Sequence, residues 1–267
     1  MNAYRFPLDE YLARIGYGRV PVANLAQLEA LQRAQVYTVP FENLDIQLGR
    51  EIVLDPARVD DKIIRQRRGG YCFELNSLFM RALITCGFTV RKLLARVHVT
   101  GTPSGRGHQL SLVTVNDRQW IVDVGFGSAC PRAPLPFEMH SPQDQDGRKF
   151  QLVPHALGYL LQVEQEGAWK ELYSFDLGEV LENDIAYGNY YTSTSPRSIF
   201  TSARVVSLCH PEGQTLLHNY RCTIVRGAST QVEHWPDSPQ YLDALRQHFG
   251  IELGSNYAAL QPIDSAC

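Results

Sequence analysis

Hydrophobic positions recur with a helical period in the first third of the chain and alternate with polar ones after Phe88. Leu25, Leu28 and Leu31 recur at the three-residue spacing that places them on one helix face. Segments beyond Phe88, such as residues 108–115, are rich in β-branched residues and alternate along the chain. The pattern predicts an α+β protein in which helices precede an antiparallel sheet or small β-barrel.

Three helices are expected before the change of period. They cover residues 25–37, 57–67 and 73–86. Asn24 suits the N-cap of the first, and Asp55 with the following proline opens the second. The pair Gly69-Gly70 is expected to end the second helix, and Gly87 the third.

Strands are expected through most of the remaining chain. They cover residues 89–99, 108–115, 119–126, 149–153, 205–209 and 220–227, with a hairpin over 158–175 that turns at Glu166-Gly167. The turn-rich stretch 101–107 is expected to connect two of these strands. A closing helix over 238–250 is expected to end at Gly250.

Composition excludes several classes of protein. The 267 residues are 44% hydrophobic and 20% charged, which suits a globular chain of two or three subdomains. The formal net charge is −3, so no basic face for nucleic acid or an anionic membrane is expected. No apolar run is long enough to span a bilayer, and the N-terminus lacks a signal-peptide core. A cytoplasmic location is therefore expected.

The cysteines predict no disulfide framework and no zinc motif. They are scattered, and none forms a Cys-x-x-Cys pair; they are Cys72, Cys86, Cys130, Cys209, Cys222 and Cys267. Most are expected to be small buried side chains.

Cys72 is different because it lies in the stretch RRGGYCFELN, at the expected start of the third helix. A helix N-terminus favours an anion, here the thiolate, which is the nucleophilic form of cysteine. Gly69 and Gly70 permit close approach of the backbone and would leave room for a substrate. The free N–H groups there are suited to an oxyanion. The alternative interpretation is an ordinary buried cysteine behind a glycine helix stop.

A nucleophilic cysteine needs a base and a group that orients the base. His108 begins an apolar strand directly after the 101–107 loop, and Asp123 interrupts the apolar segment WIVDVGF. A carboxylate in such a segment is costly unless it is paired, and an imidazole on a neighbouring strand would pair with it. His98 is the rival base, although no acidic partner is evident for it. A solvated histidine at a strand end and a turn carboxylate are the alternatives.

The glycines of Gly125-Phe126-Gly127 permit a turn that presents the phenylalanine ring to a pocket. An ordinary turn with a core phenylalanine fits equally well. No strand–GxGxxG–helix context supports dinucleotide binding here.

These motifs resemble the arylamine N-acetyltransferase family along nearly the whole chain. The matching segments are VPFENLDI (39–46), RRGGYCFELN (67–76), GHQLSLV (107–113), VDVGFG (122–127) and SPRSIFTSARVVSLCHPEG (195–213). One small departure is Ser77, where many members of the family have glycine.

The resemblance implies a papain-like Cys–His–Asp triad and three domains. These are a helical bundle over residues 1–87, a β-barrel over 88–190 and an α/β lid over 191–267. It also implies a ping-pong reaction with acetyl-coenzyme A as co-substrate and without a metal. The acetyl group would pass to arylamines, arylhydrazines or, by O-acetylation, N-hydroxyarylamines.

The resemblance also implies roles for individual residues. Cys72 would form the thioester, with His108 as its base and Asp123 as the orienting carboxylate. Residues expected to line the aryl pocket are Phe41, Val97 and Phe126, and those expected near coenzyme A are Gly107, Gly127 and Phe200.

Three other functions remain open at this point. A cysteine hydrolase or transglutaminase-like enzyme shares the triad but passes its acyl group to water or a peptide amine. An amide synthase of the same fold would ignore acetyl-coenzyme A. A non-catalytic binding module would bind its ligand unchanged when Cys72 is replaced.

Overall fold

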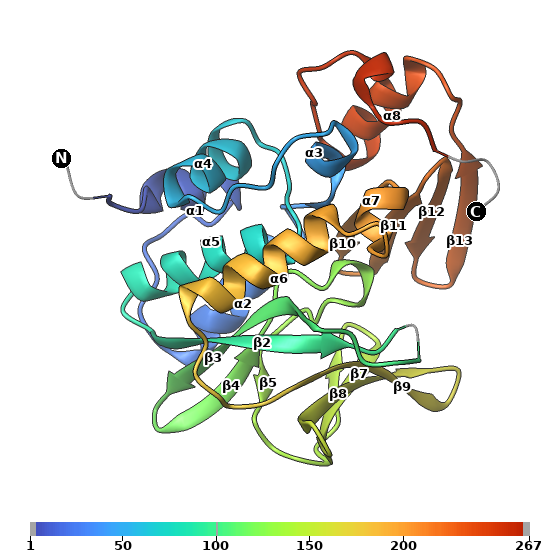
Figure 1. Cartoon of the computed structure of the whole chain (residues 1–267). Helices are drawn as coiled ribbons and strands as arrows, with labels where there is room; N and C mark the ends of the chain where they lie inside the picture. The colour runs from blue at the N-terminus through green and yellow to red at the C-terminus, as the bar shows by residue number, and fades with distance from the viewer. Residues whose placement is uncertain (1–3, 100, 264–267) are drawn as a thin grey trace.

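Two antiparallel sheets and several helices make up the computed structural model, which describes residues 4–99 and 101–263 (Figure 1). The helices are α1 (Leu8–Arg14), α2 (Leu25–Val36), α3 (Leu44–Gln47), α4 (Pro56–Asp60), α5 (Cys72–Thr85), α6 (Glu182–Thr194), α7 (Ile199–Ser202) and α8 (Gln240–Phe249). A π-helical turn, Asp61–Arg65, continues α4, and 3-10 turns cover Gly127–Ala129 and Tyr257–Ala259. The α+β class expected from the sequence is confirmed.

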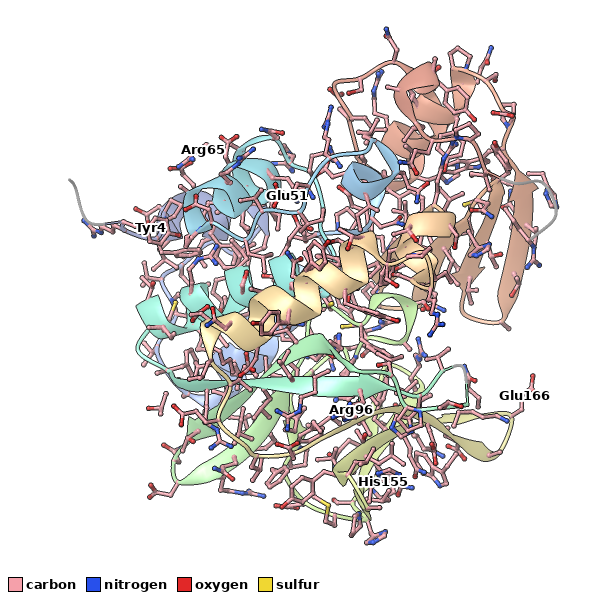
Figure 2. All side chains as sticks on the ribbon, viewed as in Figure 1. Tyr4, Glu51, Arg65, Arg96, His155 and Glu166 are labelled. Atoms are coloured by element: carbon pink, nitrogen blue, oxygen red, sulfur yellow. The ribbon has the colours of Figure 1, made fainter. Side chains whose placement is uncertain are left out.

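The larger sheet is barrel-like and has eight strands in the order β5-β4-β3-β2-β9-β8-β7-β6. Its strands are β2 (Thr89–Val97), β3 (Arg106–Val115), β4 (Arg118–Val122), β5 (Leu135–Pro136), β6 (Gln143–Gln145), β7 (Arg148–His155), β8 (Gly158–Gln165) and β9 (Ala168–Phe175). The expected turn of the β8–β9 hairpin is confirmed: Glu166 has a positive φ of 52° and its side chain points away from the hairpin tip (Figure 2).

The smaller sheet has the order β1-β10-β11-β12-β13. Its strands are β1 (Phe41–Glu42), β10 (Val205–His210), β11 (Gly213–His218), β12 (Arg221–Arg226) and β13 (Ser229–His234). Phe41 and Glu42 pair with Ser207 and Val206, so a short segment of the helical region forms the edge of the C-terminal sheet.

Helices α5 and α6 lie along the same side of the larger sheet and pack against β3 (Figure 1). The α5 face that carries Leu75, Leu78 and Phe79 is buried in the hydrophobic core between helices and sheet. A second core fills the inside of the larger sheet, and a third lies beneath α8. Within the described residues, no helix is long and apolar enough to cross a membrane.

Two helix boundaries depend on backbone conformation. Asn24 accepts a hydrogen bond from the Gln27 N–H, which confirms the expected N-cap of α2. The expected helix over 57–67 instead divides into α4 and the π-helical turn. The helical segment ends at Arg65, and Arg67, whose φ is +53°, turns the chain away before Gly69 and Gly70 are reached. The expectation that the glycine pair ends this helix was therefore wrong.

Helix α6 was not anticipated from the sequence. Its apolar and polar residues show little periodicity, and Tyr187, Tyr190 and Tyr191 are exposed. Gly188 explains part of its placement, since a methyl group there would lie 2.8 Å from the Phe73 ring and from the Arg106 carbonyl oxygen. Close approach of α6 to α5 and β3 therefore depends on a residue without a side chain.

Candidate active site

Cys72 is the first residue of α5, and 4% of its surface is exposed. The preceding residue, Tyr71, has extended backbone, and its N–H donates a 3.0 Å hydrogen bond to the Glu74 carboxylate. This arrangement satisfies one of the free N–H groups at the helix start and fixes the angle at which the chain enters α5. The Cys72 thiol therefore lies at the positive end of a fourteen-residue helix.

A buried ionic cluster holds Glu74 in place. Lys62 lies 2.8 Å from Glu74 and 2.7 Å from Asp45, and Arg68 lies 2.7 Å from Glu42. Burial opposes ionisation of Asp45, but Lys62 and Arg68 together lower its pKa to about 2. Removing one member would leave an unpaired buried charge, which costs about 3–5 kcal/mol. The cluster thus fixes the segment that leads into Cys72.

Gly69 and Gly70 allow close backbone contact, as expected, but the space beside them is not free for a substrate. A methyl group on Gly69 would lie 2.1 Å from the Pro40 carbonyl oxygen, and one on Gly70 would lie 2.9 Å from Glu74. The segment around Phe41 and the capping carboxylate fill that space. The expectation that these glycines leave room for a substrate was wrong.

His108 and Asp123 form a buried pair. The Nε2 atom of His108 lies 2.7 Å from Oδ2 of Asp123, and the two residues are 2% and 0% exposed. Burial opposes a charged ring, but the Asp123 carboxylate, with a smaller contribution from Cys72, raises the pKa of His108 to about 10. The ring is therefore held as an imidazolium at neutral pH.

Asp123 follows β4, which ends at Val122. The expectation that the carboxylate interrupts a strand was therefore wrong. Asn76 donates to its Oδ1 at 2.9 Å, and the Gly125 N–H donates to the same oxygen at 2.9 Å. Burial opposes ionisation, yet His108 and these two donors lower the pKa of Asp123. Hydrogen bonds to Oδ1 therefore fix the Asp123 carboxylate, and its Oδ2 faces the His108 imidazole.

The structure brings Cys72, His108 and Asp123 together. Nε2 of His108 faces Asp123, which leaves Nδ1 as the ring nitrogen available to the thiol. A side-chain hydrogen bond with Cys72 is among the causes that raise the pKa of His108. The thiol also lies 3.7 Å from the carbonyl oxygen of Gly107, a residue expected near coenzyme A.

Aromatic rings surround this trio. The Phe126 ring lies 4.8 Å from that of His108, centre to centre, and the Tyr173 ring lies 5.0 Å from it. The turn around Phe126 therefore presents its ring to the imidazole, and the same ring packs against the hydrophobic core. Val97 is the register partner of Tyr173, so their side chains share a face of the sheet near His108.

Phe41, Gly127 and Phe200 form a second group. The rings of Phe41 and Phe200 lie 5.8 Å apart, and a methyl group on Gly127 would lie 3.7 Å from the Phe41 ring. Tyr71 connects this group to Cys72, because it directly precedes Cys72 in the chain and its ring lies 5.9 Å from the Phe200 ring, centre to centre. Phe41 thus lies beside Gly127 and Phe200, two of the three residues expected near coenzyme A.

His98 has an acidic partner that the sequence did not reveal. Its Nδ1 lies 2.8 Å from Glu171, and its Nε2 lies 2.9 Å from the Ser174 hydroxyl. Glu171 and Ser174 come from β9, which is far from His98 along the chain. The acidic partner that was not evident from the sequence is thus Glu171, and with Ser174 it engages both ring nitrogens of His98.

Sequence reasoning missed two residues at the site. Asn76 donates to Asp123, and the buried Tyr173 packs its ring on His108. Burial and the Asp123 carboxylate raise the pKa of Tyr173 well above its usual value. A buried amide four residues after the nucleophile was a usable signal for Asn76, because that spacing places both residues on one helix face.

Comparison with known proteins identifies the family. A family model described as N-acetyltransferase matches residues 24–258. The arylamine N-acetyltransferase / N-hydroxyarylamine O-acetyltransferase of Salmonella typhimurium is 37% identical over 249 residues, 91% of this chain and 88% of the relative. The arylamine N-acetyltransferase of Escherichia coli K12 is 34% identical over 91% of this chain and 88% of its own.

Solved structures of arylamine N-acetyltransferases have the same fold as this chain. The structure of the arylamine N-acetyltransferase from Salmonella typhimurium superposes with a TM-score of 0.90 at 35% identity, over 94% of this chain and 95% of that one. The Mycobacterium marinum enzyme, described in complex with coenzyme A, has a TM-score of 0.89 at 30% identity, over 95% of this chain and 97% of its own.

The fold and the matching family model together define an acyltransferase. More particularly, the chain belongs to the arylamine N-acetyltransferase family. The family and enzyme class expected from the sequence are both confirmed.

Proposed function

We propose that this enzyme transfers an acetyl group from acetyl-coenzyme A to an arylamine through a thioester on Cys72. The observation that carries the proposal is the meeting of the Cys72 thiol, at the start of α5, with the buried His108–Asp123 pair. The names of the relatives supply the acetyl group and the amine, and the Mycobacterium marinum complex supplies coenzyme A.

In the first half-reaction, the Cys72 thiolate attacks the thioester carbonyl of acetyl-coenzyme A. A new carbon–sulfur bond forms and the bond to the coenzyme sulfur breaks. The leaving thiolate takes the proton that the His108 imidazolium holds. The exchange of one thioester for another is nearly isoenergetic, so a thiolate is a suitable nucleophile.

In the second half-reaction, the amine nitrogen attacks the acetyl-Cys72 carbonyl. His108, now neutral, accepts the proton that the nitrogen loses, and the sulfur leaves as a thiolate. The imidazolium–thiolate pair is thereby restored. Asp123 keeps Nδ1 of the ring directed at the sulfur throughout, because its carboxylate holds the opposite nitrogen at 2.7 Å.

We assign two separate groups of residues to the two substrates. Phe126 and Val97, with Tyr173 between them, lie beside the imidazole and suit the flat ring of an arylamine. Phe200, Gly127 and Gly107 are the residues that we assign to coenzyme A. Apolar walls also limit hydrolysis of the thioester, because they restrict water near the acyl carbon.

O-acetylation of N-hydroxyarylamines is the second activity that we propose for this site. The name of the Salmonella typhimurium relative includes this activity. The same acetyl-Cys72 thioester serves both acceptors, since His108 accepts a proton from an N–H or an O–H group alike. Arylhydrazines belong to the proposed acceptors for the same chemical reason.

The three-domain division, with residues 1–87 as a helical bundle, 88–190 as the barrel and 191–267 as the lid, is part of this proposal. Two hydrophobic cores support it, since one lies within the barrel strands and another lies almost wholly within residues 191–267, whereas the core of the helical region also includes residues of the other two parts. Helix α6 crosses the proposed boundary between the barrel and the lid. Strand β1, from the helical bundle, pairs with β10 of the lid. We propose the cytoplasm as the location, because its reducing conditions keep a catalytic thiol free.

Incubation with acetyl-coenzyme A alone tests the proposal. One acetyl group is expected on Cys72 by peptide mass spectrometry, with release of one equivalent of coenzyme A and none in Cys72→Ser. Addition of an arylamine should then remove the label and yield acetylated amine. Labelling of another residue, or no labelling, contradicts the proposal.

The same experiment separates the alternatives. An amide synthase would leave Cys72 unlabelled by acetyl-coenzyme A. A hydrolase would release acetate as fast without the amine as with it. A panel of arylamines, hydrazines and N-hydroxyarylamines, followed by thiol release, would rank the acceptors.

A further inference from the structure

Cys222, Glu233 and His248 converge beneath α8, in the C-terminal part of the fold and away from the candidate active site. Cys222 on β12 and Glu233 on β13 are directly opposed register partners, so their side chains lie on the same face of the sheet. His248, in the last turn of α8, approaches that face. One cysteine, one carboxylate and one histidine thus come from three separate elements.

The ligating atoms are close to one another. The Cys222 sulfur, a Glu233 carboxylate oxygen and a His248 ring nitrogen all lie within 4.8 Å of one another. Nε2 of His248 is 3.3 Å from Oε2 of Glu233. Ligands about 2.0–2.3 Å from a tetrahedral zinc ion are separated by roughly 3.3–3.8 Å, so a small inward movement completes the geometry.

The surroundings support these ligands from outside. Nε1 of Trp235 donates a hydrogen bond of 3.3 Å to the Glu233 carboxylate. The Trp235 ring also lies 5.4 Å from the His248 ring, centre to centre, and is inclined to it by 36°. Such neighbours fix the orientation of metal ligands and raise metal affinity.

Solvent reaches one side of the cluster only. Cys222 is fully buried, whereas the side chains of Glu233 and His248 are 29% and 16% exposed. The buried Cys222 thiol faces the Glu233 carboxylate across the register pair, so a thiolate at this position needs a neighbouring cation. A cation beside it would compensate the thiolate, and water from the open side would complete a fourth coordination position.

We propose that Cys222, Glu233 and His248 form a binding site for a divalent transition-metal ion, with zinc as the ion that this donor set fits best. A sulfur, a nitrogen and an oxygen ligand with one open position match the ligand chemistry of zinc. Binding moves the Cys222 proton to solvent and forms the metal–sulfur bond. The ion would tie α8 to β12 and β13, and it is independent of acetyl transfer.

Cobalt(II) is the probe for the test, because its thiolate complexes absorb in the near ultraviolet. The full chain with Cys72→Ser, which removes the active-site thiol, is stripped with a chelator and titrated with CoCl2. One equivalent is expected to produce a thiolate-to-cobalt band and the visible bands of tetrahedral cobalt. Zinc chloride should abolish these bands by displacement.

Three variants of the same chain locate the site. Cys222→Ser is expected to remove the thiolate band, and His248→Gln and Glu233→Gln to weaken cobalt binding at least about tenfold. Cys86→Ser is the matched control and should leave the titration unchanged. The partly exposed positions Glu233 and His248 keep the test valid if Cys222→Ser fails to fold. Absence of the band, or its survival in all three variants, would overturn the proposal.

Discussion

Asn76 donates a hydrogen bond of 2.9 Å to the carboxylate of Asp123, and both residues are buried. Asn76 lies four residues after Cys72 on α5, so the helix that begins at Cys72 also holds the Asp123 carboxylate. Its amide donates as well to the Gln109 carbonyl oxygen at 2.6 Å and accepts from the Val124 N–H at 3.0 Å. One amide therefore fixes α5 against β3 and the segment after β4.

Replacement of Asn76 tests this positioning role. Asn76→Ala removes one hydrogen-bond donor from Asp123 and leaves two buried backbone groups, the Gln109 carbonyl oxygen and the Val124 N–H, without this partner. Each unpaired buried group costs about 1–3 kcal/mol. We expect kcat/KM to fall roughly 10- to 100-fold, mainly in kcat, with a displaced pH profile. Ser77→Ala is the matched control: its hydroxyl donates within the helix to the Glu74 carbonyl oxygen. Steady-state kinetics with both variants would check this, and an Asn76→Ala enzyme of near-normal activity contradicts it.

The sequence predicted the regular elements whose signals are local. Asn24 identified the start of α2 because a short polar side chain caps the next N–H groups, and the β8–β9 turn was evident at Glu166-Gly167. The helix start at Cys72 was placed within one residue. Periodicity and turn chemistry depend on residues close in sequence, so these features follow from the chain alone.

The sequence did not predict features that depend on distant contacts. The pairing of His98 with Glu171 joins residues on different strands, and the Tyr173 ring meets His108 only because β2 pairs with both β3 and β9. Gly69 was interpreted as space for a substrate, yet the Pro40 carbonyl oxygen fills that space. Such contacts arise from the register between strands and from the packing of loops.

The stability of the protein should fall with rising pH because of His108. Its pKa is about 10 in the folded state, against about 6.5 in an unfolded chain. The stabilisation is therefore complete below about pH 6.5 and is lost as the pH rises through about 10. Between these values the folded state binds one more proton, which contributes a slope of about −1.4 kcal/mol per pH unit.

Urea unfolding of the wild type and of His108→Gln at pH 7.5 and 9.5 measures that contribution. Both chains should carry Cys72→Ser, so that the thiol coupled to the ring does not titrate; the chain that keeps His108 should then lose about 2 kcal/mol more than the His108→Gln chain over this interval. Asp123→Asn should also remove the slope, because the carboxylate is what raises the pKa of His108. It should reduce turnover severely while the fold is kept. Parallel pH dependences in wild type and variants would refute the buried ion pair.

Gly125 packs closely on Cys72, the residue that we propose as the nucleophile. A methyl group at Gly125 would lie 2.9 Å from the Cys72 Cα atom and 2.7 Å from the Asn76 amide nitrogen. Gly125→Ala must therefore displace the start of α5 or the segment after Asp123, at a cost of about 1–3 kcal/mol in unfolding free energy. Acetylation of the thiol should slow by a larger factor, because small misplacements of reacting groups are costly. Gly18→Ala, where no atom lies within 4 Å, is the control. Denaturant unfolding and rapid-mixing acylation assays check both effects, and equal behaviour of the two variants would show that this contact does not position the cysteine.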